Sequence, residues 1–246
     1  MDPRHLEHGH TPRDIAKRLQ QGPRISYLRD WVYGGIDGTV TTFAVVAGVV
    51  GAELSTNALL ILGAANLFAD GFSMAAANYS GTKAEIEEYE QVRRMEERHV
   101  EVAPEGEREE IRQIFAAKGF SGEALDSAVD VITGTRDRWI DTMMTEEHGL
   151  PPISRSPARA ALTTFLAFLL CGSIPLLPFV LGAPASIWAS TVMTGITFFS
   201  IGSLRSRWSP TPWWRTGMET FLIGITAASV AYLVGVILAG LLQAPS

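Results

Sequence analysis

The sequence predicts an all-α integral membrane protein with five transmembrane helices and a cytoplasmic helical module inserted between the second and the third. Two observations predict this architecture: apolar segments of spanning length recur along the chain, and the charged residues are gathered in one place. The 246 residues are 47% hydrophobic with a net charge of -6. The segment from Thr82 to Leu150 holds 18 of the 26 acids and 9 of the 20 bases, so the remainder is sparsely charged and slightly basic.

Five segments approach the roughly 20 apolar residues that a helix needs to cross a bilayer. All five are rich in Gly, Ala, Ser and Thr, which lets helices pack closely in lipid. Buried helices of a soluble protein are the alternative, but the chain has too few charged residues to cover this much apolar surface in water. The segments are Trp31 to Ala52, Ala58 to Tyr79, Ala160 to Gly182, Ile187 to Leu204 and Gly217 to Leu242.

Lys and Arg residues in the short flanks predict the orientation. They lie in the N-terminal arm, before the third span and after the fourth, whereas the other short connections and the tail hold none. We therefore expect a cytoplasmic N-terminus and module, an outside C-terminus, and the cytoplasmic membrane rather than an organelle. The polar opening to Arg29 is not expected to be a cleavable signal peptide. The expected parts are a polar arm over 1–29, two spans over 30–81, the module over 82–156 and three spans over 157–246.

Polar residues inside the spans are candidate site residues, because an intramembrane acid costs about 2.5–3.5 kcal/mol on insertion scales and usually marks a path. Asp37 lies in the first span, where Gly34 and Gly38 have the spacing that lets another helix approach. Four residues of the second span share one helical face. Together with Asp37 this stripe favours a path for a transition-metal cation, and interhelical hydrogen bonding is the alternative. The stripe is Asn66, Asp70, Met74 and Asn78.

The acidic module has helical periodicity and three ligand pairs at helical spacing. Because neither Pro nor Gly lies between Thr82 and Ala103, the second span is expected to continue into the cytoplasm as one long helix. The alternative is that these pairs bind no metal: the glutamates would be solvated on a charged helix, and the methionines would fill a small hydrophobic core. The expected helices run Thr82 to Val102, Glu107 to Lys118, Gly122 to Thr133 and Arg136 to His148. The pairs are Glu96 with His99, Glu107 with Glu110, and Met143 with Glu147, with Met144 adjacent.

These carboxylates, the imidazole and the thioethers suit Fe²⁺, Mn²⁺, Co²⁺ or Zn²⁺. The single Cys171 excludes a disulfide framework and a thiolate zinc site, and there is no calcium-binding EF-hand loop. No nucleotide-binding or hydrolase motif is present, so we expect neither an enzyme nor an ATP-driven pump, and no permanently bound cofactor. The acidic module lacks the basic stripe of nucleic-acid binders.

Several motifs follow one another in order along the chain. They are Asp37-Gly38 in the first span, Asp70-Gly71-Phe72-Ser73-Met74 in the second, Trp139-Ile140-Asp141-Thr142-Met143-Met144 ending the charged insertion, Ile174-Pro175-Leu176-Leu177-Pro178 in the third span, and Gly217-Met218-Glu219 opening the fifth. With these motifs the chain resembles the vacuolar iron transporter family from about Asp30 to Leu242. The resemblance covers nearly the whole sequence.

The resemblance implies a homodimer that moves Fe²⁺ out of the cytosol in exchange for protons. It implies a path between subunits lined by Asp37 and Met74, and a module that gathers metal ions. The module ligands implied by the family are Glu96, Glu107, Glu110, Met143, Met144 and Glu147. Two positions depart from the family pattern. Asn66 stands where the family has a glutamate, so the coupling to protons either passes to Asp70 or works differently. His99 stands where the family has a glutamate ligand, and its imidazole can still bind metal.

Our leading hypothesis is a proton-coupled Fe²⁺ transporter, with Mn²⁺ as a further substrate, that works by alternating access. Asp37 and Met74 would hold the ion in transit. The rival hypothesis is a membrane-anchored metal sensor or store in which the spans only anchor the module. The carboxylates within the spans argue against it, because a plain anchor has no need of them. A ferroxidase is a third and more distant reading.

Overall fold

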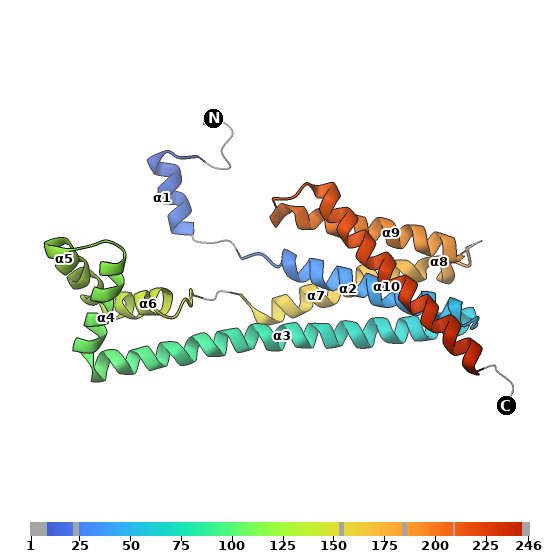
Figure 1. The fold of residues 1–246 in the computed structure, drawn as a ribbon, viewed down its shortest axis with the longest axis horizontal. Coiled ribbons are helices and arrows are strands. Elements are labelled where there is room, and N and C mark those ends of the chain that lie inside the picture. Colours follow the sequence, from blue (N-terminus) through green and yellow to red (C-terminus); the bar gives the residue numbers. More distant parts are fainter. Residues whose placement is uncertain (1–8, 22–24, 153–154, 184–185, 209, 243–246) are drawn as a thin grey trace. The chain divides into compact units, whose positions relative to one another are not determined.

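The structure is a computed structural model that describes residues 9–21, 25–152, 155–183, 186–208 and 210–242. The described residues form helices and turns without a strand (Figure 1). They divide into two compact units. The first unit comprises the residues up to Leu67 and those from Leu166 onward, and the second runs from Phe68 to Phe165. Parts of the expected 1–29 arm, 1–8 and 22–24, lie outside the described residues.

The five expected spans are confirmed as helices that are long and apolar enough to cross a membrane. The third is broken near its end, because Pro175 and Pro178 have no N–H for the helix ladder, so a 3₁₀ turn follows α7 before the helix resumes. The helices of the first unit are α1 (Pro12–Gln21), α2 (Leu28–Gly51), the start of α3 (Thr56–Val102), the end of α7 (Pro157–Ser173), η2 (Ile174–Leu176), α8 (Leu177–Val180), α9 (Ser186–Arg205), η3 (Ser206–Trp208) and α10 (Trp213–Leu242).

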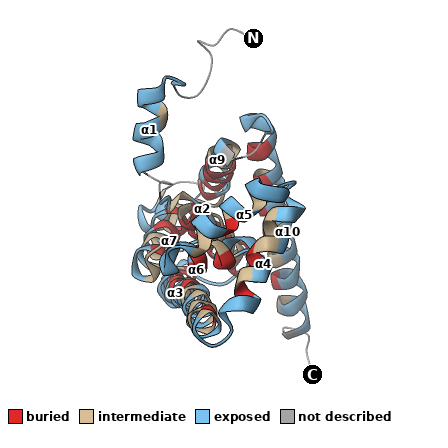
Figure 2. Cartoon of the chain, turned by 90° about the vertical axis from the view of Figure 1, so that its left-hand side faces the viewer, coloured by how far each residue is buried: buried red, intermediate tan, exposed pale blue. Residues whose placement is uncertain are grey.

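Apolar side chains also cover the outside of these helices. Only 17% of the most apolar window of α10 is buried within the protein, and Figure 2 shows exposed stretches along this helix. Leu233, Ile237 and Leu241 are among its exposed residues. A soluble protein would leave such a surface in contact with water, at a cost of about 25 cal/mol for each Å² of apolar area. The exposed faces therefore fit a lipid environment, and the protein is a multi-pass membrane protein.

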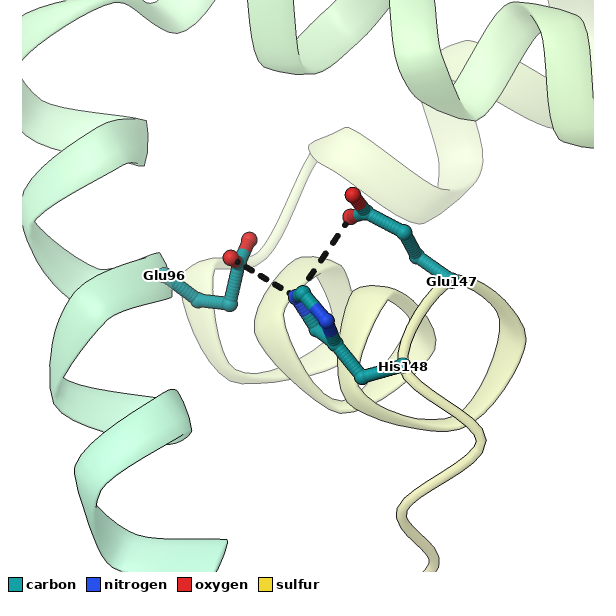
Figure 3. Close-up of side chains that lie close together, drawn as sticks. All are labelled: Glu96, Glu147 and His148. Atoms are coloured by element: carbon teal, nitrogen blue, oxygen red, sulfur yellow. Dashed lines mark hydrogen bonds and ion pairs between the residues drawn. The ribbon is translucent and has the colours of Figure 1, made fainter. Parts of the chain in front are cut away.

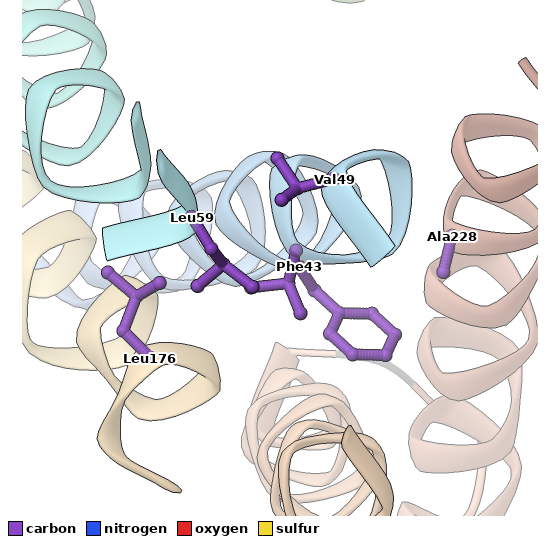
Figure 4. Close-up of a cluster of buried hydrophobic side chains, with 6 residues drawn as sticks. Phe43, Val49, Leu59, Leu176 and Ala228 are labelled. Atoms are coloured by element: carbon purple, nitrogen blue, oxygen red, sulfur yellow. The ribbon is translucent and has the colours of Figure 1, made fainter. Parts of the chain in front are cut away.

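The interior of the first unit is a hydrophobic cluster to which α2, α3, η2 and α10 contribute (Figure 4). Phe43 and Val46 of α2 are buried there with Leu59 from the start of α3 and Leu176 from the broken third span. Ala228 is the contribution of α10. The cluster joins segments from both ends of the chain and fixes how α2 packs.

Close approach between the backbones of α2 and α7 depends on glycine at two positions. A Cβ added to Gly38 of α2 would lie 2.5 Å from the carbonyl oxygen of Phe168, and one added to Gly172 of α7 would lie 2.7 Å from the carbonyl oxygen of Gly38. Both distances are shorter than the contacts that Cβ atoms make in proteins, so neither position has room for a side chain. The helices α2 and α7 therefore pack backbone to backbone here. This confirms that Gly38 lets another helix approach beside Asp37.

The second unit contains the rest of α3, which runs without interruption to Val102 as expected. The helix α4 (Pro104–Ala117) begins three residues before the expected start because Pro104 occupies its first turn. The helix α5 (Gly122–Thr133) has the expected bounds. Ile111 of α4, Val129 of α5 and Met143 of the next helix form a second buried cluster.

The helix α6 (Arg136–Glu146) ends two residues before the expected His148. Gly149 has a φ of 66°, a left-handed conformation that glycine adopts readily, and the Leu150 N–H donates to the carbonyl of Met144. The chain therefore turns away from the helix axis at Glu147 and His148. Which side of the membrane α4–α6 occupy stays a prediction.

Replacing Gly38 by Leu should destabilise the first unit, because the added side chain would collide with the backbone of Phe168. Overpacking of this kind costs about 1–3 kcal/mol or more. We expect a lower unfolding temperature in detergent, followed by circular dichroism. Gly81→Leu on α3 is the matched control, since nothing lies within 4 Å of a Cβ at Gly81. Equal unfolding temperatures for the two variants would contradict this packing.

Candidate metal centre

The centre of the candidate site is the carboxylate of Glu96 on α3. Its side chain is 2% exposed, although it lies on the most charged stretch of the helix. One carboxylate oxygen, Oε1, has a hydrogen-bond partner, whereas Oε2 is buried and has none among the described residues. A buried carboxylate needs a compensating charge or hydrogen bonds, because it has lost its hydration.

His99 and Glu107 form the first group around Glu96. His99 follows Glu96 by three residues, so both lie on one side of α3, with Nδ1 3.8 Å from Glu96 Oε1. Glu107 lies in the first turn of α4, directly after the break at Ala103, and its Oε1 lies 3.4 Å from His99 Nδ1. The Glu107 carboxylate is also buried, and its Oε2 has no partner in the described part of the chain.

Glu147 and His148 form the second group and come from the turn that ends α6 (Figure 3). The Nε2 atom of His148 lies 3.0 Å from Glu96 Oε1 and 3.6 Å from Glu147 Oε2. The two groups therefore share Glu96. In each group the potential ligand atoms lie within 4.8 Å of one another, as in a site that can hold a metal ion.

The electrostatics of the cluster favour a cation. Burial raises the pKa of Glu107 to about 7, with further contributions from the negative charges of Glu110 and Glu96. Burial also raises the pKa of Glu147, and the charge of Glu110 adds to the effect while His148 opposes it. The carboxylates thus repel one another, and a bound divalent cation would relieve that repulsion.

Several basic side chains of this unit are paired with other acids. Arg93 donates to Asp141 at 2.5 Å, Arg112 lies 2.6 Å from Asp126, and Arg108 pairs with Asp130. Lys118 pairs with Glu146, and Arg136 lies 2.5 Å from Glu101. Within the described residues, no Lys or Arg forms an ion pair with Glu96, Glu107 or Glu147. Lys and Arg therefore do not compensate the negative charge of the cluster, and its basic neighbours are the two histidines.

The structure brings four of the seven predicted module ligands together: Glu96, His99, Glu107 and Glu147. Glu110 is exposed and acts on the cluster through its charge. Met143 and Met144 are fully buried, and Met143 packs in the second hydrophobic cluster. Their role as ligands stays a prediction.

Sequence reasoning missed His148. This residue follows the end of α6, and it lies four residues after Met144 but at no helical spacing to any of the predicted carboxylate ligands. Its partner, Glu96, is 52 residues away in the sequence, on another helix. Two local signals were present: the four-residue spacing from Met144, and the glycine directly after His148, which marks a turn that can redirect the side chain.

The predicted path residues lie on α2 and α3. Asp37 is half-buried beside the close contact at Gly38. Asn66, Asp70 and Met74 are half-buried along one face of α3, and the Asn66 side-chain nitrogen is buried without a partner among the described residues. Asn78 differs, because its Nδ2 donates to Thr164 Oγ1 at 2.7 Å, as the alternative of interhelical hydrogen bonding predicts. A transport role for these residues stays a prediction.

Comparison with known proteins gives consistent matches over most of the chain. The family model described as "VIT family" matches residues 28–236. A vacuolar iron transporter of Toxoplasma gondii is 35% identical over 227 residues, which cover 86% of this chain and 74% of that protein. Vacuolar iron transporter 1 of Arabidopsis thaliana is 31% identical, with 83% of each chain covered. Vacuolar iron transporter 1 of Oryza sativa is 27% identical, with 93% and 89% covered.

Metal binding at this cluster should weaken as the pH falls through about 7, because the proton that Glu107 then takes up competes with the ion. One competing proton reduces the affinity by up to about tenfold for each pH unit below the pKa. Mn²⁺ binding to the full-length protein between pH 6 and 8, followed by the electron paramagnetic resonance of free Mn²⁺, measures this effect.

Glu107→Gln should bind Mn²⁺ more weakly at pH 8 and lose less affinity between pH 8 and 6 than the unmodified protein. Glu109→Gln is the matched control, since Glu109 is exposed on the same helix and pairs with Arg112. Parallel pH profiles for the unmodified protein and Glu107→Gln would show that Glu107 does not compete with the metal.

Proposed function

The chain belongs to the VIT family, and on this premise we propose that it transports Fe²⁺ across a membrane, out of the cytosol. Relatives that cover most of the chain are named as vacuolar iron transporters. The observation that carries the proposal is the combination of five candidate spans with a half-buried carboxylate, Asp37, within the first of them. A helix that only anchors a protein has no use for a carboxylate in lipid.

In the proposed mechanism, Asp37 and Met74 bind the ion in transit, and protons drive its movement by alternating access. The Asp37 carboxylate compensates the charge of the ion, and the Met74 thioether favours a transition metal over Mg²⁺ or Ca²⁺. Protonation of Asp37 removes that compensation and releases the ion. Asn66 cannot take up a proton, so Asp70, one turn further along α3, is the second proton-accepting group of the proposed path beside Asp37.

The residues Glu96, His99, Glu107, Glu147 and His148 form what we call the Glu96 cluster. This cluster would gather ions from the cytosol before transport. Its uncompensated carboxylates support this role, as does the burial of Glu96 and Glu107. We further propose a homodimer, the usual state of symmetric oligomers, and Mn²⁺ as a second substrate. The relatives' names refer to vacuoles. For this chain the cytoplasmic membrane stays the prediction.

Proteoliposomes with an imposed pH gradient test the transport mechanism. We expect Fe²⁺ uptake by the unmodified protein, and at least about a tenfold loss with Asp37→Asn or after collapse of the gradient, since both remove the proton-coupled step. Asp14→Asn on α1 is the control for the same chemical change at an exposed position. Uptake that persists in Asp37→Asn would refute the mechanism. Absence of uptake by the unmodified protein would favour the sensor or store.

Single-cysteine labelling tests the orientation. In a Cys171→Ser background, Ser55→Cys lies in the exposed connection between α2 and α3, and Ser127→Cys lies on the exposed side of α5. We expect an impermeant maleimide to label Ser55→Cys in intact cells and Ser127→Cys only after permeabilisation, because the basic flanks are predicted to be cytoplasmic. The opposite pattern would invert the proposed topology.

A further inference from the structure

Two histidine rings flank the same buried carboxylate. His99 reaches Glu96 from one turn further along α3. Figure 3 shows how His148 reaches it from the end of α6. Both place a ring nitrogen on the Oε1 side of Glu96, at 3.8 and 3.0 Å. Each ring nitrogen also lies near a second carboxylate, at 3.4 Å for Glu107 and at 3.6 Å for Glu147.

These separations match those between ligands of one metal ion. Two atoms that each lie about 2.0–2.2 Å from a common ion are about 3–4 Å apart in a tetrahedral or octahedral arrangement. The separations of His148 from Glu96 and Glu147, and of His99 from Glu96 and Glu107, fall between 3.0 and 3.8 Å. An ion could replace the hydrogen-bonding protons with little movement of the side chains.

Simple ion pairing with the histidines does not satisfy the cluster. Four carboxylates act on one another there, those of Glu96, Glu107, Glu110 and Glu147. Both imidazoles lie on the Oε1 side of Glu96. The Oε2 atoms of Glu96 and Glu107 are also buried without partners among the described residues, so each has a lone pair to offer to a ligand.

We propose that His99 and His148 are themselves metal ligands, so that the Glu96 cluster binds divalent ions through a mixed imidazole and carboxylate set that prefers Zn²⁺ and Co²⁺ to Mn²⁺. Imidazole nitrogen suits Zn²⁺ and other late transition metals, whereas Mn²⁺ favours carboxylate, carbonyl and water oxygens. The inference rests on that part of the proposed function in which the cluster binds metal, and it is independent of transport. The His pair thereby sets which cytosolic ions the cluster accepts.

The test uses the full-length protein in detergent at pH 8, in a background with His5→Gln, His8→Gln and His10→Gln, so that His99 and His148 are the remaining imidazoles. Dissociation constants for Zn²⁺ and Mn²⁺ are measured by competition with a chelator, and Co²⁺ is followed by its visible absorption. The variants are His99→Gln, His148→Gln, the double variant and His148→Glu. Arg98→Gln, exposed beside His99, is the matched control.

We expect the double variant to lower the preference for Zn²⁺ over Mn²⁺ by at least about tenfold, since loss of a second-shell group alone costs that much. The Co²⁺ band should move to longer wavelength, because oxygen is a weaker-field ligand than imidazole nitrogen. His148→Glu should still bind Mn²⁺, and its preference for Zn²⁺ over Mn²⁺ should be lower than that of the background protein. A misfolded variant would not bind Mn²⁺.

The inference would be overturned if the double variant still bound metal with the same preference and the same Co²⁺ spectrum. The histidines would then be ion-pair partners of Glu96 and not metal ligands. Absence of binding of all three metals by the background protein would instead refute metal binding by the cluster, and this inference with it. Loss of folding is excluded by unfolding curves that match those of Arg98→Gln.

Discussion

The packing of the membrane helices depends on a property of lipid: it offers no hydrogen-bond partner and no hydrophobic gain when two apolar helices associate. Helices in this environment associate through close contact, which requires small residues. At Gly38 and Gly172 the contact is between main-chain atoms, and no side chain could be added to either residue. Asp37 is the direct neighbour of Gly38, so the glycine that permits the contact also places the carboxylate next to it.

The same constraint explains why the fold could be predicted from the sequence. Spans must be long and apolar, so five such segments predicted five helices, and the absence of Pro and Gly between Thr82 and Ala103 predicted the uninterrupted α3. Helix ends were harder to place. At Pro104 the proline moved the start of α4 earlier, and at Gly149 a left-handed turn ended α6 before His148.

The candidate site was predicted only in part, and the reason is geometric. Helical spacing pairs residues within one helix, and it identified Glu96 with His99. It carries no information on contacts between helices, so the approach of His148 to Glu96 could not be read from the sequence. The sequence also does not show which glutamates are buried. Glu96 and Glu107 stand among exposed glutamates, but the packing of α4 against its neighbours removes both from water.

Ion pairs divide the acidic unit into two kinds of carboxylate. Asp126, Asp130 and Asp141 are exposed and are paired with arginines that join one helix to another. Exposed pairs of this kind contribute little each, about 0–1 kcal/mol. Glu96 and Glu107 are buried and receive no such partner, although arginines are plentiful on the same helices. Their basic neighbours are His99 and His148 instead, and an imidazole, unlike a guanidinium group, can also bind a metal ion.

The donor chemistry of the cluster also differs from that of the predicted path. The cluster contains two imidazoles and several carboxylates, whereas Asp37, Asp70 and Met74 offer carboxylate and thioether donors without nitrogen. Metal affinity follows donor type, so the two sets would rank the same ions differently. Under the proposed function an ion must be accepted by both sets, and the selectivity of transport would then be narrower than that of either one.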